Sequence, residues 1–471
     1  MEKPVIPNVL ADRYASTPMV KIWAPENKVR LSRRLWVAVL KAQRELGLIV
    51  PSGVIEAYER AIEDIDLAAI AAREFITKHD VKANVEVFHA VAGMTTQEWI
   101  HRGMTARDST DNVEQLQIRD SLVLLRDRTV AVLHRLMECA KENISRDLSG
   151  RTHNIPAQTT TLGKRFANIA EELMLGFARL ETFIASYPLR GIKGPVGTQQ
   201  DMVHLLGSAE KALALEDRVR EFLGFGAVLT SVGQVYPRSL DFAAVSILAE
   251  LASSPANLAK NIRLMAGHGL MSEEFNEERV GSSAMPHKIN PSWCDRVSGL
   301  MGIMRGHLAM LAGLLGDQWY EGDVSCSAPR RVALPDAFFT LDGIYETTLT
   351  ILGTLRVFPE AISRELTSYL PFLSSTALLV QGMARGLGRE EGHRLIKKHA
   401  VAAIQSGDPG SFATGLAGDE QFPLNLEEIQ ITIATPNHGL AVPQVEGIVA
   451  KVLVIEERHP SAWAYEPEPI R

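Results

Sequence analysis

The segment at positions 281–291, GSSAMPHKINP, gathers two hydroxyls, a histidine, a lysine and an asparagine between a glycine and two prolines. A serine hydroxyl can take a proton from carbon only when its alkoxide is stabilised by amides, a lysine or a helix N-terminus. Ser282 and Ser283 have such groups beside them, because Lys288 supplies positive charge and Asn290 a directional hydrogen-bond donor. These residues suit proton removal from the carbon next to a substrate carboxylate. The alternative is a capped turn between two helices whose lysine is solvated.

Two histidines stand in polar surroundings that suit proton transfer. His153 lies in a Thr-His-Asn step before Pro156, and His79 is followed by Asp80, which could orient another group. A histidine can hold or donate a proton near neutral pH. Each could equally be a structural histidine, and the His79–Asp80 pair could simply cap a turn.

Motifs for metals and cofactors are missing from the sequence. The three cysteines, Cys139, Cys294 and Cys326, have no paired spacing, so they predict neither a disulfide framework nor a zinc site. Neither HExxH nor a Walker loop occurs, and GLGREEG at 386–392 follows a helical pattern instead of a strand. We therefore expect no metal and no cofactor.

Basic residues concentrate in polar segments that separate apolar helical patterns. Arginine forks suit phosphates and carboxylates, so a small, highly anionic substrate would explain the clustering. The alternative is that several of these charges only stabilise helix ends. The residues concerned are Lys78, Arg107, Arg151, Lys164, Arg165, Lys193, Lys288, Arg296, Arg330 and Arg331, with Arg13 near the start.

Composition and charge argue against some classes of partner. The chain has 471 residues, 22% of them charged, and a net charge of −7 with both signs mixed along the sequence. This argues against general binding to nucleic acid or to a membrane surface. The start, MEKPVIPNVL, lacks the layout of a signal peptide, and the nearest candidate for a membrane span, IMRGHLAMLAGLLG, is interrupted by Arg305 and His307. We expect a cytoplasmic protein with reduced thiols.

Apolar residues recur at helical spacing through most of the chain, which predicts an all-α fold of bundled long helices. Period-two alternation is scarce, and no strand–helix–strand rhythm is visible. Asp111 or Asn112 is the expected N-cap of one long helix. The longest predicted helices cover 29–47, 111–143, 164–186, 238–266, 292–316 and 335–356.

The polar turn at 103–110 and the break at Pro359 divide the chain into three predicted domains. Residues 1–104 form an N-terminal helical domain that contains the KHDV segment. Residues 105–357 form the central long-helix bundle with the 281–291 loop, and residues 358–471 form a C-terminal helical domain.

Several segments resemble, in order, those of the fumarase/aspartase/argininosuccinate lyase superfamily. GSSAMPHKINP is similar to the superfamily's signature loop, and the RYAS and KHDV segments are similar to the adenylosuccinate lyase family in particular. The resemblance runs from residue 8 to about 340, and after 356 it rests on general layout. The matching stretches are NVLADRYAS, ITKHDVKA, GMTARDSTDNVEQLQI, GRTHNIPAQTTTLGKRFA, YPLRGIKGPVGTQQDM, VGQVYPRSLD, GSSAMPHKINP and QWYEGDVSCSAPRRVALPDAF.

This resemblance implies a reaction and an assembly. The reaction would be elimination of fumarate from adenylosuccinate, giving AMP, and from the succinylo-carboxamide ribotide SAICAR, giving AICAR, in purine biosynthesis. The assembly would be a homotetramer built on a long helical bundle, with each active site shared between three subunits. The expected partner is a small anionic nucleotide.

Roles for single residues follow from the same resemblance. Ser282 would remove the proton beside the succinyl carboxylate, and Lys288 and Asn290 would stabilise the carbanion. His153 would protonate the departing nitrogen, with His79 nearby. Arg13 and Tyr14 would hold the ribose phosphate, and the remaining positions that align with substrate contacts are Lys78, Asp80, Thr105, Thr152, Gln199, Arg296, Ser327 and Arg331.

The sequence departs from the family pattern at three positions. Ala106 stands where many relatives have serine, so one substrate hydrogen bond is put in doubt. Gly322 stands where some relatives have arginine, and Lys78 replaces an arginine of some relatives. None of the three is the proposed acid or base.

Two other functions remain open at this point. Argininosuccinate lyase or a carboxymuconate cycloisomerase would use the same serine loop on a different anion. A non-catalytic helical scaffold is the alternative from another class, and it predicts loss of the acid or the base, whereas Ser282 and His153 are both present.

Overall fold

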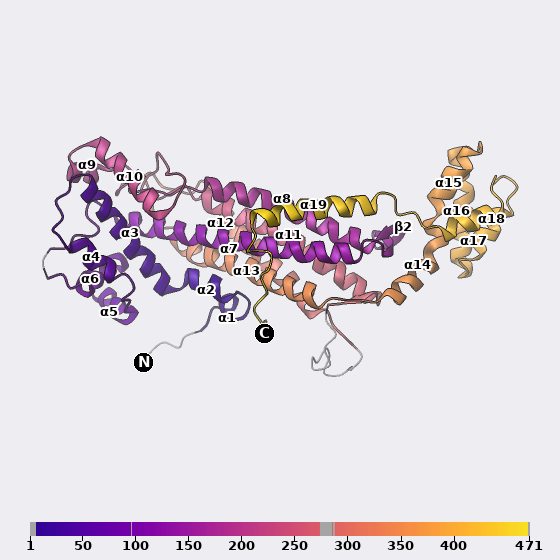
Figure 1. Ribbon diagram of the computed structural model, residues 1–471, viewed down its shortest axis with the longest axis horizontal. Helices are drawn as coiled ribbons and strands as arrows, with labels where there is room; N and C mark the ends of the chain where they lie inside the picture. The colour runs from indigo at the N-terminus through magenta and orange to yellow at the C-terminus, as the bar shows by residue number, and fades with distance from the viewer. Residues whose placement is uncertain (1–5, 96, 274–284, 286–287, 470–471) are drawn as a thin grey trace.

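The computed structural model describes residues 6–95, 97–273, 285 and 288–469. They form an elongated molecule with a bundle of long helices in the middle and a group of shorter helices at each end (Figure 1). The predicted all-α class is confirmed, since the described strands make only two small two-stranded ladders.

The central bundle explains why the longest apolar patterns are so long. In α7, Leu122, Val130 and Ala131 point in different directions around the helix, and all three are fully buried. A helix that buries residues on several sides belongs in the core of a bundle. Its partners in the bundle surround it along most of its length. The bundle helices are α7 (Ala106–Glu142), α8 (Leu162–Ser186), α11 (Ser239–Gly267), α12 (Ser292–Ala312), α13 (Ser327–Thr354) and α19 (Ala441–Arg458).

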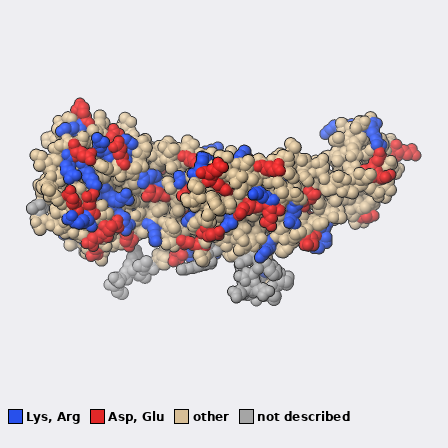
Figure 2. Space-filling view, viewed as in Figure 1, with Lys and Arg blue, Asp and Glu red and all other residues tan. Residues whose placement is uncertain are grey.

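One end of the bundle carries a separate hydrophobic core built around Trp36, Tyr58, Phe88 and Trp99. Figure 2 shows Lys, Arg, Asp and Glu side chains intermingled over this end, without a large area of a single sign. The helices at this end are α3 (Pro25–Glu45), α4 (Val54–Arg60), α5 (Leu67–Thr77), α6 (Asp80–Val91), α9 (Gln200–Leu206) and α10 (Ala209–Leu223).

The opposite end has a third core, which includes Leu378, Leu395 and Phe412. After this group of helices the chain turns back, and α19 packs against α7 and α8 in the central bundle. The three-domain division stays a prediction. The helices of this end are α14 (Pro359–Leu373), α15 (Ser375–Ala384), α16 (Arg389–Ser406), α17 (Ser411–Ala417) and α18 (Leu426–Ala434).

Two strand pairs lie near this end. Strand alternation is scarce in the sequence, but residues 147–161 form the antiparallel hairpin of β1 (Asp147–Thr152) and β2 (Ile155–Thr161). Its two-residue turn, His153 and Asn154, has φ values of 52° and 63°, as in the tight hairpin turns that favour asparagine. The second pair joins β3 (Met271–Ser272) to β4 (Arg356–Val357).

Two predicted helix starts lie five or more residues after the observed ones. α7 begins at Ala106 with Thr105 as its N-cap, because Thr105 and Asp108 form a reciprocal capping box. Asp111 and Asn112 are therefore buried inside the helix. α13 begins at Ser327, eight residues before the predicted 335, with Pro335 tolerated inside it.

α11 meets the length and composition expected of a membrane-crossing helix, and is the one described helix that does so. It is a stronger candidate by that test than the segment at 303–316. Half of its most apolar window is buried, and it packs against α8, α12 and α13. Its apolar character is therefore accounted for by the core of the bundle.

The short helices α1 (Val9–Arg13) and α2 (Thr17–Trp23) lie on the side of the bundle. The segment between them approaches α13 so closely that a Cβ built on Gly343 would lie 2.8 Å from the Cβ of Tyr14. Backbone contact of this kind requires glycine at position 343. The Ser16 N–H also donates to Asp342 Oδ2 on α13 over 2.5 Å.

Replacing Gly343 with alanine should force Tyr14 away from α13. We expect the free energy of unfolding to fall by about 1–3 kcal/mol, the usual cost of overpacking. Gly353→Ala on the same helix is the control, because a Cβ there would meet nothing within 4 Å. Equal urea-denaturation midpoints for the two variants would contradict this packing.

Candidate active site

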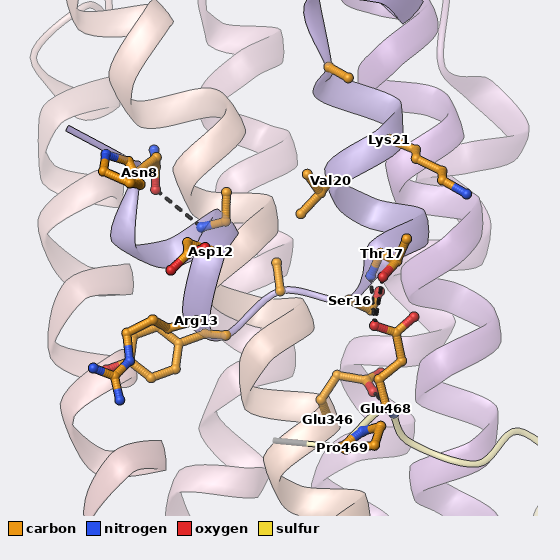
Figure 3. Close-up of a pocket in the computed structure, with 15 residues that line it drawn as sticks. Asn8, Asp12, Arg13, Ser16, Thr17, Val20, Lys21, Glu346, Glu468 and Pro469 are labelled. Atoms are coloured by element: carbon orange, nitrogen blue, oxygen red, sulfur yellow. Dashed lines mark hydrogen bonds between the residues drawn. The ribbon is translucent and has the colours of Figure 1, made fainter. Parts of the chain in front are cut away.

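Arg13 and Tyr14 line a cavity of about 510 Å³ between α1, α2, α13 and the C-terminal segment. Figure 3 shows Arg13 on one side of this cavity and Glu346 and Glu468 on the other. Thr17 donates from both its backbone N–H and its hydroxyl to Glu468 Oε2, over 2.9 and 3.0 Å. Asn8 Nδ2 donates to Asp336 Oδ1 over 2.7 Å, so the segment that carries Arg13 is fixed on both sides.

The beginning of α12 adds a second arginine near Arg13 and Tyr14. The guanidinium carbon of Arg296 lies 5.3 Å from the centre of the Tyr14 ring. Lys288 is exposed, and it and Asn290 lie in the segment that leads directly into α12. The structure therefore brings Arg13, Tyr14 and Arg296 together. Ser282 and Ser283 lie outside the described residues.

A second group forms at the α3–α6 end, where a buried carboxylate positions two predicted site residues. Asp108 Oδ2 accepts from the Thr105 N–H over 2.8 Å, and Asp108 Oδ1 accepts from the Lys193 N–H over 2.9 Å. The Gln199 N–H in turn donates to the Lys193 carbonyl over 3.0 Å. Arg190, fully buried, pairs with Asp108. One ion pair thus fixes the start of α7 and the loop that carries Gln199.

The KHDV segment lies at the junction of α5 and α6. Lys78 adopts a left-handed conformation with φ of 53°, and its ammonium lies 3.9 Å from the centre of the Phe75 ring. His79 is the N-cap of α6, and its Nδ1 accepts from the Lys82 N–H over 3.3 Å. The His79 side chain is half exposed. The capped-turn interpretation is therefore correct for one ring nitrogen, and Nε2 is left for another role.

Asp80 and Arg331 line a common cavity of about 480 Å³, together with Ser109 and Thr110 of α7. Ser327 begins α13 one turn before Arg331. The cavity is therefore lined by chain segments that are far apart in sequence. Their mixed charges and hydroxyls suit a polar ligand.

Thr152 and His153 form a third group at the tip of the β1–β2 hairpin, where both are exposed. Thr105 caps one end of α7, and the hairpin follows its other end (Figure 1). α7 has 37 residues, and at 1.5 Å per residue such a helix spans about 55 Å. His153 and the group around Thr105 and His79 therefore cannot meet within one chain.

Several predicted anion-binding cations are instead neutralised inside the protein. Arg330 donates from Nε to Asp241 Oδ2 over 2.7 Å and pairs with Glu114 Oε2 at 2.8 Å. Burial opposes its charge, but these acids raise its pKa well above the usual value. Lys193 pairs with Glu216 at 2.6 Å and Arg107 with Asp111 at 3.3 Å. Arg107, Lys193 and Arg330 thus belong to internal ion pairs, whereas the alternative from the sequence had placed such charges at stabilised helix ends.

The Gly322 departure has a local packing reason. A Cβ built on Gly322 would lie 2.9 Å from Gln234 Cβ, and the Gln234 N–H donates to the Glu321 carbonyl over 2.6 Å. An arginine at 322 would have to displace Gln234. Ala106 is the first residue of α7 and has no hydroxyl to offer.

Sequence reasoning missed the acids that support these groups. Asp108 could have been found from its spacing, because a threonine followed three residues later by an acid is a capping-box pattern. Glu346 gives no such signal, since a glutamate in a long helical pattern ordinarily faces solvent. Among the described residues, no group of three or more His, Cys, Asp or Glu side chains could hold a metal ion.

Two buried carboxyls of α13 lie next to the Arg13–Tyr14 segment. Burial raises the pKa of Asp342 to about 6. Burial, followed by the neighbouring charge of Asp342, raises the pKa of Glu346 to about 7. Glu346 accepts from the Tyr465 hydroxyl over 2.9 Å and from the Glu468 N–H over 2.7 Å, and Arg128 Nε lies 3.5 Å away. Glu346 thus collects donors from the C-terminal segment.

Comparison with known proteins shows the family and the fold of the chain. The family described as Lyase matches residues 15–306. The chain therefore belongs to the lyase family. Solved structures share the fold: 3-carboxy-cis,cis-muconate lactonizing enzyme from Pseudomonas putida has a TM-score of 0.81 at 22% identity, covering 95% of this chain and 99% of that one. A fumarate lyase from Mesorhizobium sp. BNC1 also has a TM-score of 0.81 at 22% identity, covering 95% and 100%.

Relatives found by sequence define the family within the lyases more narrowly. Adenylosuccinate lyase of Saccharomyces cerevisiae is 34% identical over 94% of this chain and 93% of its own length. The Schistosoma mansoni enzyme of the same name is 32% identical over 93% of each chain. The Methanothermobacter thermautotrophicus enzyme is 32% identical over 84% of this chain and 87% of its own. The chain belongs to the adenylosuccinate lyase family.

The raised pKa of Glu346 predicts a pH-dependent stability. Its folded-state pKa of about 7 lies above the reference value of 4.5. The folded protein therefore keeps a proton that the unfolded chain releases, and stability falls as pH rises through this window. Relative to wild type, the free energy of unfolding of Glu346→Gln should therefore rise by about 2.5 kcal/mol between about pH 5 and about pH 8.

Urea denaturation of both proteins at the two pH values measures this gain. Glu466→Gln is the control, because Glu466 is exposed on the same C-terminal segment and pairs with Arg135. A wild-type-to-variant difference that stays constant with pH would show that Glu346 is not protonated in the folded protein.

Proposed function

We propose that the protein eliminates fumarate from adenylosuccinate, giving AMP, and from SAICAR, giving AICAR. The supporting observation is the relationship to adenylosuccinate lyases over nearly the whole chain. The structure adds a cavity with Arg13 and Tyr14 at its edge and Arg296 beside Tyr14. In the proposal this group holds the ribose phosphate, as arginine forks suit phosphate oxygens.

The proposed reaction needs one base and one acid. Ser282 takes the proton from the carbon beside the succinyl carboxylate, and Lys288 and Asn290 stabilise the negative charge that spreads onto that carboxylate. The electron pair of the broken C–H bond forms the C=C bond of fumarate, and the C–N bond breaks. His153 gives a proton to the departing nitrogen, with His79 as its neighbour.

The remaining residues are proposed to contact the substrate. At the α3–α6 end, the position of Arg331 beside Asp80 supports this role, since both line one cavity. Lys288 and Asn290 act beside the base Ser282, as described above. The other proposed contacts are Lys78, Thr105, Thr152, Gln199, Arg296 and Ser327.

Each site is proposed to be completed by other copies of the chain in a homotetramer. The separation of His153 from His79 and Thr105 by the length of α7, about 55 Å, supports this proposal. Only residues of neighbouring chains can then bring the three groups together. Cyclic or dihedral symmetry would give every chain the same set of contacts.

A surface along α12 supports the same assembly. Gly299, Gly302 and Gly306 recur at helical spacing on its exposed side, and a Cβ built on any of them would meet nothing within 4 Å. Ile303 and Met310 are 40% and 38% exposed on the same helix. Small and apolar residues exposed in a row are typical of a helix that packs against another copy. We propose that the tetramer covers this surface.

We also propose that the enzyme is cytoplasmic.

The rival functions make different predictions. A carboxymuconate cycloisomerase or an argininosuccinate lyase would act on an anion without a phosphate, so Arg13 would matter little for it. A non-catalytic scaffold would bind no nucleotide. The identity to adenylosuccinate lyases, 34% against 22% for the lactonizing enzyme, favours the nucleotide substrate.

Purified protein should release fumarate from adenylosuccinate and not from argininosuccinate, as followed by absorbance. Ser282→Ala should lower kcat by about 10²- to 10⁴-fold, the usual contribution of a positioned base, while AMP still binds. Ser283→Ala in the same loop is the matched control. Turnover of argininosuccinate would overturn the substrate, and near-normal turnover by Ser282→Ala would overturn the base.

If each active site is formed by more than one chain, two inactive variants should regain activity when they are mixed. His79→Gln and His153→Gln should each be poorly active alone. Because the two residues of one site come from different chains, subunit exchange in an equal mixture should restore about a quarter of the wild-type sites. Each variant mixed with itself is the control. A mixture no more active than its separate components would overturn the proposal that the two histidines act in one shared site.

A further inference from the structure

The C-terminal segment reaches back to the junction between α1 and α2. Glu468 Oε2 accepts from both the N–H and the hydroxyl of Thr17, the first residue of α2, over 2.9 and 3.0 Å. A carboxylate at a helix N-terminus is favoured by the helix dipole. Thr17 is four residues after Arg13, and Figure 3 shows Glu468 and Arg13 at the edges of one cavity.

Glu468 is itself held in place by a buried carboxyl. Its backbone N–H donates to Glu346 Oε2 over 2.7 Å, and the Tyr465 hydroxyl donates to the same carboxyl over 2.9 and 3.0 Å. Arg128 lies over the Tyr465 ring, with its guanidinium carbon 3.0 Å from the ring centre. The position of Glu468 is therefore set by residues of α7 and α13 in the core.

The neighbouring Glu466 takes no part in this contact. It pairs with Arg135 of α7 and is 72% exposed. Two glutamates two residues apart on one segment thus have different partners, one on the bundle surface and one on α2.

We propose that Glu468 is a positioning residue for the phosphate clamp: through Thr17 it fixes the Arg13–Tyr14 segment, so that the C-terminal segment tunes affinity for the phosphate of the substrate. This inference rests on the proposed function, in which Arg13 and Tyr14 hold that phosphate.

The physical argument concerns the two short helices that flank the clamp. α1 has five residues and α2 has seven, and helices this short have little stability of their own. Contacts with other elements must therefore hold them. Asn8–Asp336 and Ser16–Asp342 attach the segment to α13, and Thr17–Glu468 attaches it from the opposite side of the cavity. Loss of the last contact leaves the start of α2 attached through Ser16–Asp342 on one side only, while the bundle stays intact.

The test compares Glu468→Ala with Glu466→Ala in the full-length protein. Glu468→Ala should weaken AMP binding about tenfold in calorimetry, the scale of one charge-assisted hydrogen bond. Adenosine, which lacks the phosphate, should bind both variants like wild type. With adenylosuccinate, KM should rise by a similar factor while kcat stays within about twofold. Tyr465→Phe, which loses only the hydroxyl donor to Glu346, should show a smaller change in the same direction.

Outcomes of this test separate the two proposals. Unchanged AMP affinity in Glu468→Ala, or equal weakening of AMP and adenosine, would overturn the positioning role. A wild-type protein that binds AMP but does not cleave adenylosuccinate would overturn the proposed function. In that protein, weaker AMP binding by Glu468→Ala would still support the role of Glu468.

Discussion

The length and rigidity of α7 constrain everything else in the structure. It is a 37-residue helix, buried around most of its circumference, with one polar group at its start and the β1–β2 hairpin beyond its end. A buried helix of this kind cannot bend to bring its ends together, because its neighbours pack along most of its length. Chemistry that needs groups from both ends must therefore occur between molecules. The elongated shape and the dispersed polar residues follow from this one constraint.

Polar residues inside the bundle serve mainly to position others. Asp108 and Arg190 are fully buried, and their ion pair sets both the start of α7 and the loop before α9. A buried pair contributes little net stability, and removing one partner leaves an uncompensated charge. Glu346 has the corresponding role on the other side, where it gathers Arg128, Tyr465 and the Glu468 backbone. In both places a buried carboxyl on a rigid helix accepts hydrogen bonds that hold a neighbouring segment in position.

Much of the fold could be predicted from the sequence, because apolar residues at helical spacing give a strong signal in long helices. Errors arose where the signal was polar. The run of threonines in β2 lacks an apolar alternation, so the hairpin was not foreseen. At α7, Asp111 looked like a cap, although the true cap lies at Thr105. Most of the candidate site residues came from the family resemblance, and their separation into three groups depends on the lengths of the helices between them. No single sequence states these directly.

The helices α14–α18 form, in topological terms, an insertion. The chain leaves the bundle at the end of α13, builds a separate core around Leu395 and Phe412, and returns to the bundle as α19. Such a unit meets the rest of the molecule through few elements, so its loops can change in length without disturbing the long helices. Evolutionary drift in size and sequence should therefore gather between residues 359 and 435, while the helices on either side of that range keep their lengths.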